Sequence, residues 1–475
     1  MSNYRPIPSD DFEDPPFSPW RIKAREYTRR SAVVRRVIAI AASLAFAVPL
    51  FLLLAYVRED RPRPLSENIV HPHNTSLDSD IVTFTSLSAS SSLSASLSAP
   101  PPASTSLPSS NHTSHDPVVF SLIMWSTDSA REGAILMKSI IMYTSAPVEF
   151  HIICDPDARV YLERRLNLVH HPRHNVLVRY YHVTWDAMIA RLKREGAVVS
   201  DHSAGTPGLM KLFIHEILPL SVKKSIFIDT DTFFISDPTL LWEHFKSIPS
   251  NVAVSMPSHP EMMAPEWHNA NRICSCIMLL NLERLREIRL MDSSVYRSDP
   301  QGPPAFSPPA FHAMFGPPGP QGHYEGVKLG DQGYWWAIIN HDPEIFQHLS
   351  YDWEVSSCLL DMYMTGLGHD DATESEELAI QIHTYATPHQ GQVILPKLVH
   401  FNCLDESPLY YEWHGWQDPN NGLNQRWGAA VRYHIGWKWL WLNQGSNETV
   451  ITTEIVENAG FLDELLSNTL PATSS

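Results

Sequence analysis

The chain has 475 residues, of which 43 % are hydrophobic and 18 % are charged, so it can build one large or two ordinary domains with a substantial core. Its formal net charge of −17 argues against a general nucleic-acid-binding protein, and no nucleic acid is expected as a partner. The chain beyond residue 36 is more acidic still, because a cluster of arginines precedes that point: Arg21, Arg25, Arg29, Arg30, Arg35 and Arg36.

Residues 1–36 are polar, basic and proline-bearing, which predicts an unstructured cytoplasmic tail. The next 21 residues, 37–57, carry no charge and have the length that a helix needs to cross a bilayer. A cleaved signal peptide would start nearer the N-terminus, so we interpret this stretch as a transmembrane signal-anchor. A helix buried in the core of a globular domain is the alternative for this stretch. Basic residues are denser before it than after it, which predicts that the rest of the chain is luminal.

Residues 58–116 are rich in Ser, Thr, Pro and Leu and predict a disordered stalk of the kind that carries O-linked sugars. Three sequons for N-glycosylation follow the apolar stretch, at Asn74, Asn111 and Asn447, in agreement with a luminal location. Tail, single span, stalk and globular part together predict a single-pass type II protein of the Golgi or endoplasmic reticulum membrane. This arrangement favours a luminal enzyme that acts on glycans or secreted proteins.

A globular domain is predicted over residues 117–445, followed by a C-terminal tail over residues 446–475. The first half of this domain alternates apolar strands with segments of helical spacing. The expected strands and helices, in chain order, are 118–125, 129–144, 148–154, 157–169, 176–181, 209–218 and 225–228. This order predicts an α/β domain with a mostly parallel sheet and a nucleotide-type crevice.

The strand at 225–228 ends in two aspartates one residue apart, Asp229 and Asp231, with Thr230 between them. The pattern is typical of a buried parallel strand whose carboxyl end presents side chains at the edge where α/β sheets bind ligands. Two carboxylates so close repel each other unless a cation lies between them, and Mg²⁺ or Mn²⁺ carrying a diphosphate fits that need. The bland alternative is a turn in which aspartate bonds to nearby backbone N–H groups.

The second half of the domain is less regular. A Pro- and Gly-rich loop is expected over residues 291–330, and a loop of that length is either functional or disordered. A Trp-rich helix near the end is expected to bury its aromatic side chains. The other expected elements are helices at 240–245, 282–290, 332–339 and 426–442, strands at 252–256, 276–280, 380–383 and 397–402, and an acidic excursion at 361–377.

All five cysteines, Cys154, Cys274, Cys276, Cys358 and Cys403, fall in the globular part. In an oxidising lumen one or two disulfides are expected, with connectivity open and at least one free thiol because the count is odd. The pair separated by one residue is expected to lie too close within one strand to bond comfortably. A zinc site is not predicted, because no CxxC-type pattern is present.

Other residues could complete a site around the aspartate pair. A neutral imidazole is a reasonable third ligand, and His400 lies at the end of a short apolar strand, although a lone histidine among 24 is more often a surface or core residue. Asp331 and Gln332 offer a carboxylate and an amide at a loop-to-helix junction, where a helix cap is the alternative. Lys211 could reach a phosphate or be a solvated helix charge.

Four blocks in this order and spacing resemble glycosyltransferase family 8, the glycogenin-like retaining transferases of the GT-A fold. The blocks lie at residues 208–219, 222–242, 277–286 and 329–332. Trp353 and residues 398–402 fit two later positions of the family. The resemblance covers residues 118–442 and is strongest to the xylosyltransferase domain of LARGE-type enzymes.

The resemblance implies Mn²⁺, or Mg²⁺, bound by Asp229, Asp231 and His400 and bridging the diphosphate of a UDP-sugar donor. It implies a retaining transfer of xylose or a hexose to a glycan or glycoprotein acceptor, by front-side attack and without a protein nucleophile. A homodimer is left open. The remaining implied contacts are Ile123 and Trp125 around the uridine, Thr230 beside the donor, Lys211 near the phosphate or sugar, and Asp331 and Gln332 facing the sugar and acceptor.

The chain departs from the family in three places. Cys274-Ser275-Cys276 stands where Asn or Ser, a small residue and Gly are usual, and Gly333 replaces a common Asp. No His-x-x-Gly-x-x-Lys loop follows the short strand 398–402. These changes leave the proposed metal ligands in place but leave the acceptor and diphosphate contacts open.

Two other functions fit parts of the sequence. A haloacid-dehalogenase-type phosphatase carries Asp-x-Asp after an apolar strand, which the stretch 229–233 approaches, and Asp370 and Asp371 could mimic its later acidic pair. That motif belongs near the start of its domain, whereas three strands precede it here. A catalytically silent membrane protein that binds a glycan or a partner is the other alternative, motivated by the altered segment 274–276.

Overall fold

The computed structural model describes residues 116–200, 202–259, 264–299, 301–364, 371–404 and 409–467. The predicted cytoplasmic tail (1–36), the predicted span (37–57) and all but the last residue of the predicted stalk (58–116) lie outside these ranges. Within the described ranges, no helix combines the length and the apolar character that a bilayer crossing requires.

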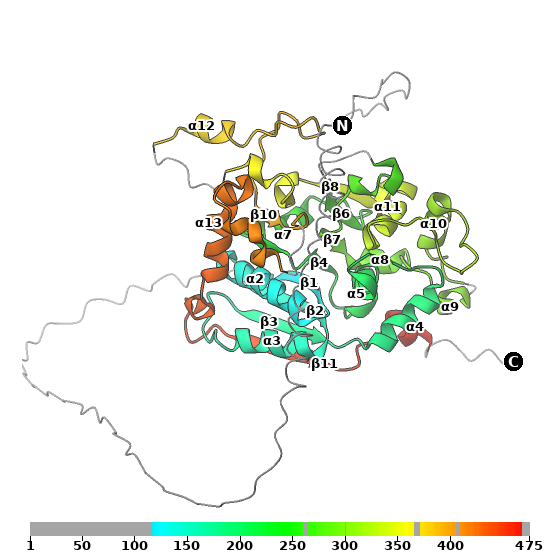
Figure 1. Ribbon diagram of the computed structural model, residues 1–475. Coiled ribbons are helices and arrows are strands. Elements are labelled where there is room, and N and C mark those ends of the chain that lie inside the picture. The colour runs from blue at the N-terminus through cyan, green and yellow to red at the C-terminus, as the bar shows by residue number, and fades with distance from the viewer. Residues whose placement is uncertain are drawn as a thin grey trace, which may run out of the picture. The chain divides into compact units, whose positions relative to one another are not determined.

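The described domain is built on an eight-stranded sheet with the order β11-β3-β2-β1-β4-β7-β6-β8 (Figure 1). Neighbouring strands are parallel throughout, except where β7 pairs with β4 and β6. The predicted α/β class with a mixed, mostly parallel sheet is therefore confirmed. The strands are β1 (Val118–Met124), β2 (Val148–Cys154), β3 (Val176–Tyr181), β4 (Lys224–Ile228), β6 (Val254–Pro257), β7 (Ile277–Asn281), β8 (Phe346–Leu349) and β11 (Ile451–Val456).

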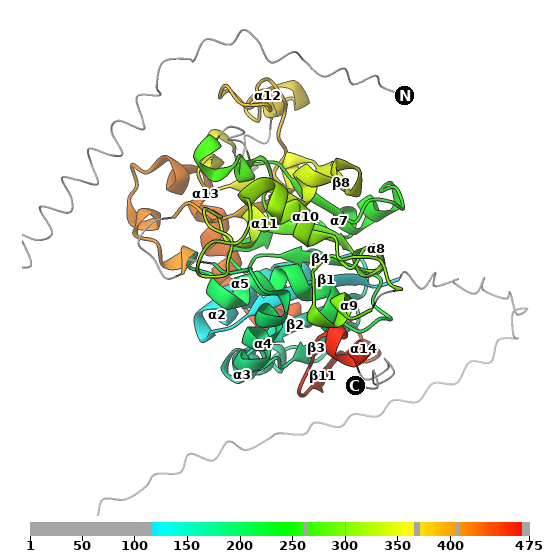
Figure 2. The same ribbon diagram turned by 90° about the vertical axis from the view of Figure 1, so that its right-hand side faces the viewer.

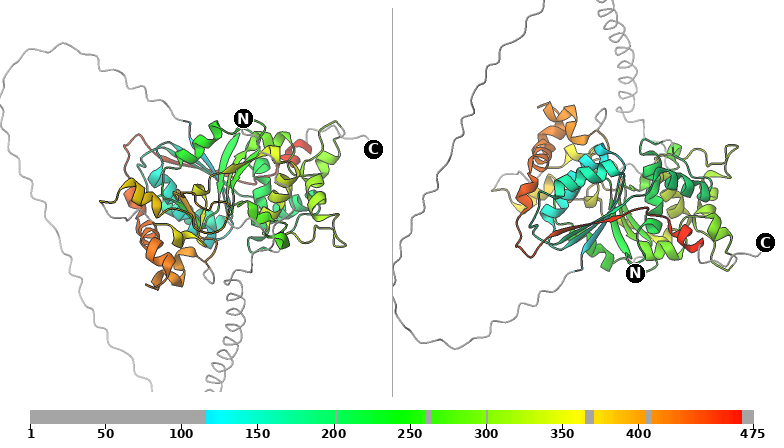
Figure 3. Two further views of the ribbon diagram at one scale, coloured as in Figure 1. Left: turned by 90° about the horizontal axis from the view of Figure 1, so that it is seen from above. Right: turned by 90° about the horizontal axis from the view of Figure 1, so that it is seen from below.

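The central strands are apolar on both faces because helices cover both faces. On one face, α2 (Thr127–Tyr143) and α3 (Pro156–Leu166) pack against β1, β2 and β3. On the other, α4 (Trp185–Glu195), α8 (Leu282–Glu287) and α11 (Asp331–His341) bury their apolar side chains. Figure 3 shows this layering, with the cyan helices on one side of the sheet and most of the green and yellow-green helices on the other.

The helix starts follow local sequence signals. The side chain of Ser126 accepts a hydrogen bond from the Ser129 N–H, and Ser129 bonds back to it, which forms a capping box at α2. Asp155, the residue after β2, caps α3 by accepting a hydrogen bond from the N–H of Ala158, and Pro156 occupies the first position of the helix. These caps end β1 and β2 sharply at one edge of the sheet, which is the edge where β4 also ends.

A second sheet of three strands, with the order β5-β10-β9, stands beside the carboxyl end of β4. It consists of β5 (Thr232–Phe234), β9 (Val355–Ser356) and β10 (Leu398–His400). α13 (Gly422–Gly436) packs against it through an aromatic cluster that includes Trp427. Since β5 begins directly after the aspartate pair, this sheet joins the C-terminal part of the domain to the predicted site.

The helix predicted over residues 209–218 is broken. The segment consists of α5 (Gly205–Leu209), a 3₁₀ helix at Met210–Phe213 and α6 (Ile214–Ile217). A 3₁₀ turn within a helix has poorer hydrogen-bond geometry and often marks a functional or strained position. Here the turn carries Lys211, which is buried and forms ion pairs with Asp229 and Asp331.

The Pro- and Gly-rich stretch 291–330 is only partly irregular. Its described residues include α9 (Ser294–Arg297) and α10 (Ser307–Phe315). The prolines of α10 lie in its first turn, where a missing N–H costs little. The ring of Phe311 lies 4.9 Å from that of Tyr334 in α11, so the segment is anchored to the core.

Two later predictions, a strand at 380–383 and a Trp-rich helix at 426–442, also differ in detail. Residues 380–383 make only an isolated bridge, between Ile382 and Val393. The Trp-rich helix divides into α13 and a 3₁₀ helix at Trp439–Leu442, and Trp441 is 50 % exposed rather than in the core. Two further short helices of the described chain are α7 (Thr239–Glu243) and α12 (Glu374–Ala379).

The segment predicted as a C-terminal tail from residue 446 belongs to the domain. β11 forms the edge of the main sheet by pairing in parallel with β3, and α14 (Leu462–Ser467) packs against α9 and α6 (Figure 2). The buried Asp463 accepts hydrogen bonds of 2.7 and 2.9 Å from Arg194 and 2.8 Å from Ser293. These charge-assisted bonds fix α14, so the domain boundary at residue 445 is corrected.

Candidate functional site

The two aspartates of the predicted site lie where β4 ends, in a turn that leads into β5. The N–H of Asp229 donates to the carbonyl of Cys276 at 2.8 Å, which continues the pairing of β4 with β7. The hydroxyl of Thr232 donates to the carbonyl of Asp229 at 2.8 Å and tightens the turn. Both aspartate side chains remain partly exposed, at 28 % and 29 %, so they can reach a ligand.

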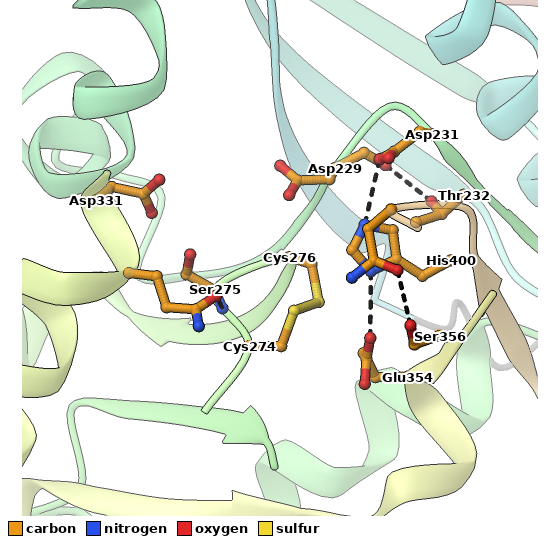
Figure 4. Close-up of a disulfide and its surroundings, with 12 residues drawn as sticks. Asp229, Asp231, Thr232, Cys274, Ser275, Cys276, Asp331, Glu354, Ser356 and His400 are labelled. Carbon is orange, nitrogen blue, oxygen red and sulfur yellow. Dashed lines mark hydrogen bonds and ion pairs between the residues drawn. A yellow bond between two sulfur atoms is a disulfide. The ribbon is translucent and has the colours of Figure 1, made fainter. Parts of the chain in front are cut away.

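His400 lies opposite this turn because β10 pairs antiparallel with β5, which sets His400 against Thr232. The N–H of Phe401 donates to the carbonyl of Asp231 at 2.9 Å and extends the pairing. The Nε2 atom of His400 is 3.3 Å from Oδ1 of Asp231, and its Nδ1 atom is 3.2 Å from Oε1 of Glu354 (Figure 4). Backbone pairing therefore brings together residues that are 169 positions apart.

Asp229, Asp231 and His400 each offer a ligand atom, and these atoms lie within 4.8 Å of one another. Two carboxylate oxygens and one imidazole nitrogen form a donor set that suits a divalent cation such as Mn²⁺. The second ring nitrogen of His400 bonds to a buried carboxylate, which is the usual way a protein orients a metal-binding imidazole. The residues present thus fit the metal that the sequence predicts.

The other end of the site is formed by Lys211, Asp229 and Asp331. Nζ of Lys211 lies 2.8 Å from Oδ1 of Asp229 and 3.5 Å from Oδ1 of Asp331. Asp331 is the first residue of α11, and its Oδ2 atom is buried without a hydrogen-bond partner. Gly330 precedes it with φ of 59°, a conformation that favours glycine. The structure therefore brings Lys211 and Asp331 to the aspartate pair.

Gln332 is held at the rim of the site by backbone groups. Its Nε2 atom donates to the carbonyl of Ala270 at 3.0 Å, and its Oε1 atom accepts from the N–H of Ser275 at 3.4 Å. It lines the same cleft as the residues above. Both of its polar ends are engaged, so its side chain is well positioned but has little freedom to follow a ligand.

Ile123, Trp125 and Thr230 are not brought into the cleft in the same way. Thr230 is half-buried between the two aspartates. Ile123 and Trp125 lie at the carboxyl end of β1 and pack, half-buried, against the core on one face of the sheet. They reach the correct edge of the sheet, but none of the three lines the cleft. Their contact with a nucleotide stays a prediction.

Burial and neighbouring charges shift the protonation of these groups. Burial raises the pKa of Asp229 to about 6, although Lys211 opposes the shift. Burial also disfavours ionisation of Asp231, but the His400 imidazole outweighs it and holds the pKa of Asp231 below its ordinary value. Burial alone would lower the pKa of His400, whereas Asp231 and Glu354 raise it to about 10. A cation that binds His400 at neutral pH must therefore displace a proton.

The cleft around these groups has a volume of about 520 Å³. Both ends described above open into it, and four of the five cysteines lie on its walls. Its lining comprises His202, Ser203, Lys211, Asp229, Asp231, His259, Trp267, Asn271, Cys274, Ser275, Cys276, Leu329, Asp331, Gln332, Cys358, His400, Asn402 and Cys403. This volume falls within the range of small-molecule sites.

The cysteines form two disulfides, Cys274–Cys276 and Cys358–Cys403, and the buried Cys154 is free. The expectation that Cys274 and Cys276 would not bond is wrong. The two residues precede β7 and form a turn, not a strand, with their Cα atoms 5.2 Å apart. The turn allows the two side chains to meet.

Sequence reasoning missed two carboxylates at the site. Glu354 is fully buried and bonds to His400. Glu132 of α2 accepts a 2.8 Å hydrogen bond from the N–H of Tyr410, and burial, followed by the charge of Asp231, raises its pKa to about 8. A carboxylate behind a metal-binding histidine is a general expectation, but no local pattern marks which acidic residue supplies it.

The haloacid-dehalogenase alternative gains no support from the site. Asp371 is exposed and does not line the cleft, and Asp370 lies outside the described residues. β1, β2 and β3 precede β4 in the described chain, whereas the phosphatase motif belongs near the start of its domain.

Comparison with known proteins supports the resemblance to LARGE-type enzymes. No protein-family model matches the sequence. Human xylosyl- and glucuronyltransferase LARGE2 is 26 % identical over 240 residues, covering 48 % of this chain and 29 % of the relative. The rat protein of that name is 29 % identical over 177 residues, covering 34 % of this chain and 24 % of the relative. The chain thus matches less than a third of these relatives' length, and membership of glycosyltransferase family 8 stays a prediction.

Solved structures of glycosyltransferases align with the chain at low similarity. Apo mouse xyloside xylosyltransferase 1 has 16 % identity and a TM-score of 0.39, with 60 % of this chain and 99 % of that chain covered. The galactosyltransferase LgtC, in complex with donor and acceptor sugar analogues, has 10 % identity and a TM-score of 0.41, with 67 % and 95 % covered. TM-scores at this level carry no argument about function.

Proposed function

We propose that this chain is a retaining glycosyltransferase of the GT-A type that moves a sugar from a UDP-sugar to a glycan or glycoprotein acceptor. One observation carries the proposal above the others. Asp229 and Asp231, at the carboxyl end of β4, and His400 of β10 converge with their ligand atoms within 4.8 Å. Sequence similarity to xylosyl- and glucuronyltransferases supports it.

In this proposal Asp229, Asp231 and His400 hold Mn²⁺ or Mg²⁺. When bound, the cation would neutralise the diphosphate of the donor and stabilise UDP as it leaves. Glu354 keeps the imidazole of His400 in the required orientation through the 3.2 Å bond to its Nδ1 atom. The protein thus supplies a preorganised clamp at one end of the cleft.

The other end of the cleft would position the sugar. Lys211 carries a permanent charge, because Asp229 and Asp331 outweigh the effect of burial and raise its pKa. An ammonium group there can donate hydrogen bonds to a phosphate or sugar oxygen. Asp331 and Gln332 lie at the start of α11 and would face the sugar and the acceptor hydroxyl. Positioning of donor and acceptor then accounts for most of the rate increase.

The proposed setting is the lumen of the Golgi or endoplasmic reticulum, with residues 37–57 as a single transmembrane anchor. The apolar stretch, the stalk and the sequons of the sequence support it. The sequon asparagine Asn447 is exposed just before β11, where a glycan would not disturb the core.

A donor screen tests the proposal. The purified full chain with Mn²⁺ is incubated with UDP-xylose, UDP-glucose, UDP-galactose or UDP-N-acetylglucosamine, and the release of UDP is measured. We expect release with one donor and its loss when the metal is chelated. A chain that neither hydrolyses nor transfers from any UDP-sugar would favour the silent binding protein, and a phospho-aspartate trapped at Asp229 would favour the phosphatase.

A further inference from the structure

A second group of potential ligands lies beside the aspartate–histidine set. Cys274, Cys276, Glu354 and His400 each offer one ligand atom, and these four atoms lie within 4.8 Å of one another. Figure 4 shows the sulfur atoms of the two cysteines on the side of the cleft that faces His400 and Glu354. The elements that supply them, the turn before β7, the segment before β9 and the end of β10, are all held by backbone pairing.

All four side chains are buried. The exposed fractions are 4 % for Cys274, 2 % for Cys276, 0 % for Glu354 and 3 % for His400. One carboxylate oxygen of Glu354 bonds to His400, whereas the other, Oε2, is buried without a hydrogen-bond partner. A buried carboxylate oxygen without a partner is costly, so Oε2 is available to a cation that enters beside the two cysteines.

We infer that Cys274, Cys276, Glu354 and His400 form a second metal site, of zinc chemistry, when the two cysteines are reduced. Two thiolates, an imidazole and a carboxylate are the ligands that four-coordinate Zn²⁺ takes, at roughly 2.0 to 2.3 Å. Ligand atoms at such bond lengths lie about 3.3 to 3.8 Å apart, so the two sulfur atoms must separate once their bond is broken, while the other ligand atoms need only a small inward movement. The inference goes beyond the proposed function, since it requires no transferase activity.

The thiol state of the cysteine pair decides whether this site exists. Joined as a disulfide, the sulfur atoms have no thiolate to offer. A small dithiol reduces the bond by giving two electrons and two protons, becoming a cyclic disulfide and leaving two Cys thiols. Zn²⁺ then binds as both thiols release their protons. In an oxidising compartment the disulfide keeps the zinc site closed.

His400 belongs to both sets of ligands, so the two sites compete for it. A cation held by the cysteine pair takes the imidazole away from Asp229 and Asp231 and leaves only two carboxylates there. Reduction with zinc present would therefore weaken binding of Mn²⁺ to the aspartate pair. This coupling is specific to a chain that carries Cys-Ser-Cys before β7.

Cobalt is a suitable probe, because Co²⁺ bound to thiolates gives a charge-transfer absorption band that other ligands do not give. The full chain is reduced with a dithiol, desalted without oxygen and titrated with Co²⁺, and Zn²⁺ is then added to displace it. We expect one thiolate-bound Co²⁺ per chain, released by Zn²⁺, and no such band in the oxidised chain. Glu354→Gln should weaken Co²⁺ binding by about tenfold or more.

Two variants separate this site from its neighbours. Cys276→Ser should abolish the band, whereas the double variant Cys358→Ser, Cys403→Ser, which removes the other cleft disulfide, should keep it. Asp229→Asn should also keep it, because Asp229 belongs only to the other set. The inference is overturned if the reduced chain shows no thiolate-to-cobalt band, or if the band survives Cys276→Ser.

Discussion

The two ends of the cleft have the same charge pattern but different chemistry. At one end the imidazole of His400 lies between Asp231 and Glu354, and at the other the ammonium group of Lys211 lies between Asp229 and Asp331. Each end thus places one cation between two carboxylates. The imidazole can lose its proton and become a metal ligand, whereas an ammonium group cannot ligate a metal and stays charged.

This difference assigns the two ends distinct roles in the proposed transfer. The imidazole end can exchange its proton for a divalent cation without leaving a buried charge unpaired. The lysine end keeps a permanent positive charge for a phosphate or sugar oxygen. Variants at the imidazole end should therefore change metal dependence, and variants at the lysine end should change donor binding.

The largest effect is expected from Asp231→Asn. This change removes a metal ligand and the partner of His400 while keeping the shape of the side chain. Activity should fall by at least about 100-fold, more than the loss expected when a residue behind a ligand is removed. UDP release with saturating Mn²⁺ is the measurement. Asp237→Asn is the matched control, since Asp237 caps the turn before α7 outside the cleft, and it should leave activity unchanged. Equal activity in both variants would contradict the metal assignment.

The second-largest effect, a weaker binding of Mn²⁺, is expected from Glu354→Gln. The carboxylate of Glu354 orients the imidazole of His400 through its contact with the Nδ1 atom. Loss of this carboxylate should weaken Mn²⁺ binding by about 10- to 100-fold. The half-saturating Mn²⁺ concentration should rise, and most of the activity should return at high metal. Asp352→Asn serves as the control because Asp352 bonds to Lys397 and to the N–H of Leu395, away from His400. An unchanged metal requirement would place Glu354 outside the site.

A smaller effect, mainly on the KM for the donor, is expected from Lys211→Gln. Loss of one charge-assisted contact costs about 1.5 to 3 kcal/mol, which corresponds to a rise in the donor KM of about tenfold or more. The metal requirement should change less than in Glu354→Gln, because Lys211 supplies no ligand and affects Mn²⁺ binding only through the ionisation of Asp229. Steady-state kinetics at varied donor and varied Mn²⁺ separate the two quantities. Lys138→Gln is the control, since Lys138 is also buried but bonds to Ile435 and Trp437. A change in the Mn²⁺ requirement without a change in the donor KM would contradict the different roles assigned to the two ends of the cleft.

The residues of the site could be predicted from the sequence to different degrees. Asp229, Asp231 and the strand before them form a local pattern, so their place at the sheet edge could be predicted with the alternation of strands and helices. His400 could only be suggested, since its position depends on β10 pairing with β5 across the chain. Glu354 carried no signal, because its role arises from burial behind His400.

Dependence on contacts between distant parts of the chain also explains the predictions of the fold that are wrong. The sequence of β11 predicts a tail because this exposed, polar strand has no apolar run, and only its pairing with β3 makes it part of the sheet. The helix predicted over 209–218 has the correct apolar spacing, but it tightens to a 3₁₀ turn at Met210–Phe213, where the buried Lys211 forms its ion pair with Asp229. Long-range pairing and buried charges, in each case, decided what local periodicity could not.

The smallest expected effect concerns the stability of the metal-free protein. The pKa of His400 is raised from its ordinary 6.5 to about 10 in the folded state, so its ion pairs stabilise the fold fully below about pH 6.5. That stability is lost as the pH rises through about 10. The midpoint of thermal unfolding, measured in chelator from pH 7 to 10.5, should fall more steeply in the wild type than in His400→Gln. A bond to a charged group contributes about 2 kcal/mol, so the difference should be a few degrees.

Subtracting the two pH profiles removes the groups that titrate in this range independently of His400, such as Lys138 and Glu195. Lys211→Gln should leave the slope between pH 7 and 10.5 close to that of the wild type, because the raised pKa of Lys211 lies above this window. Parallel profiles for the wild type and His400→Gln would mean that the imidazole is not held as a cation between Asp231 and Glu354. The imidazole end would then have no proton to exchange for a metal, and the contrast with the lysine end would fail.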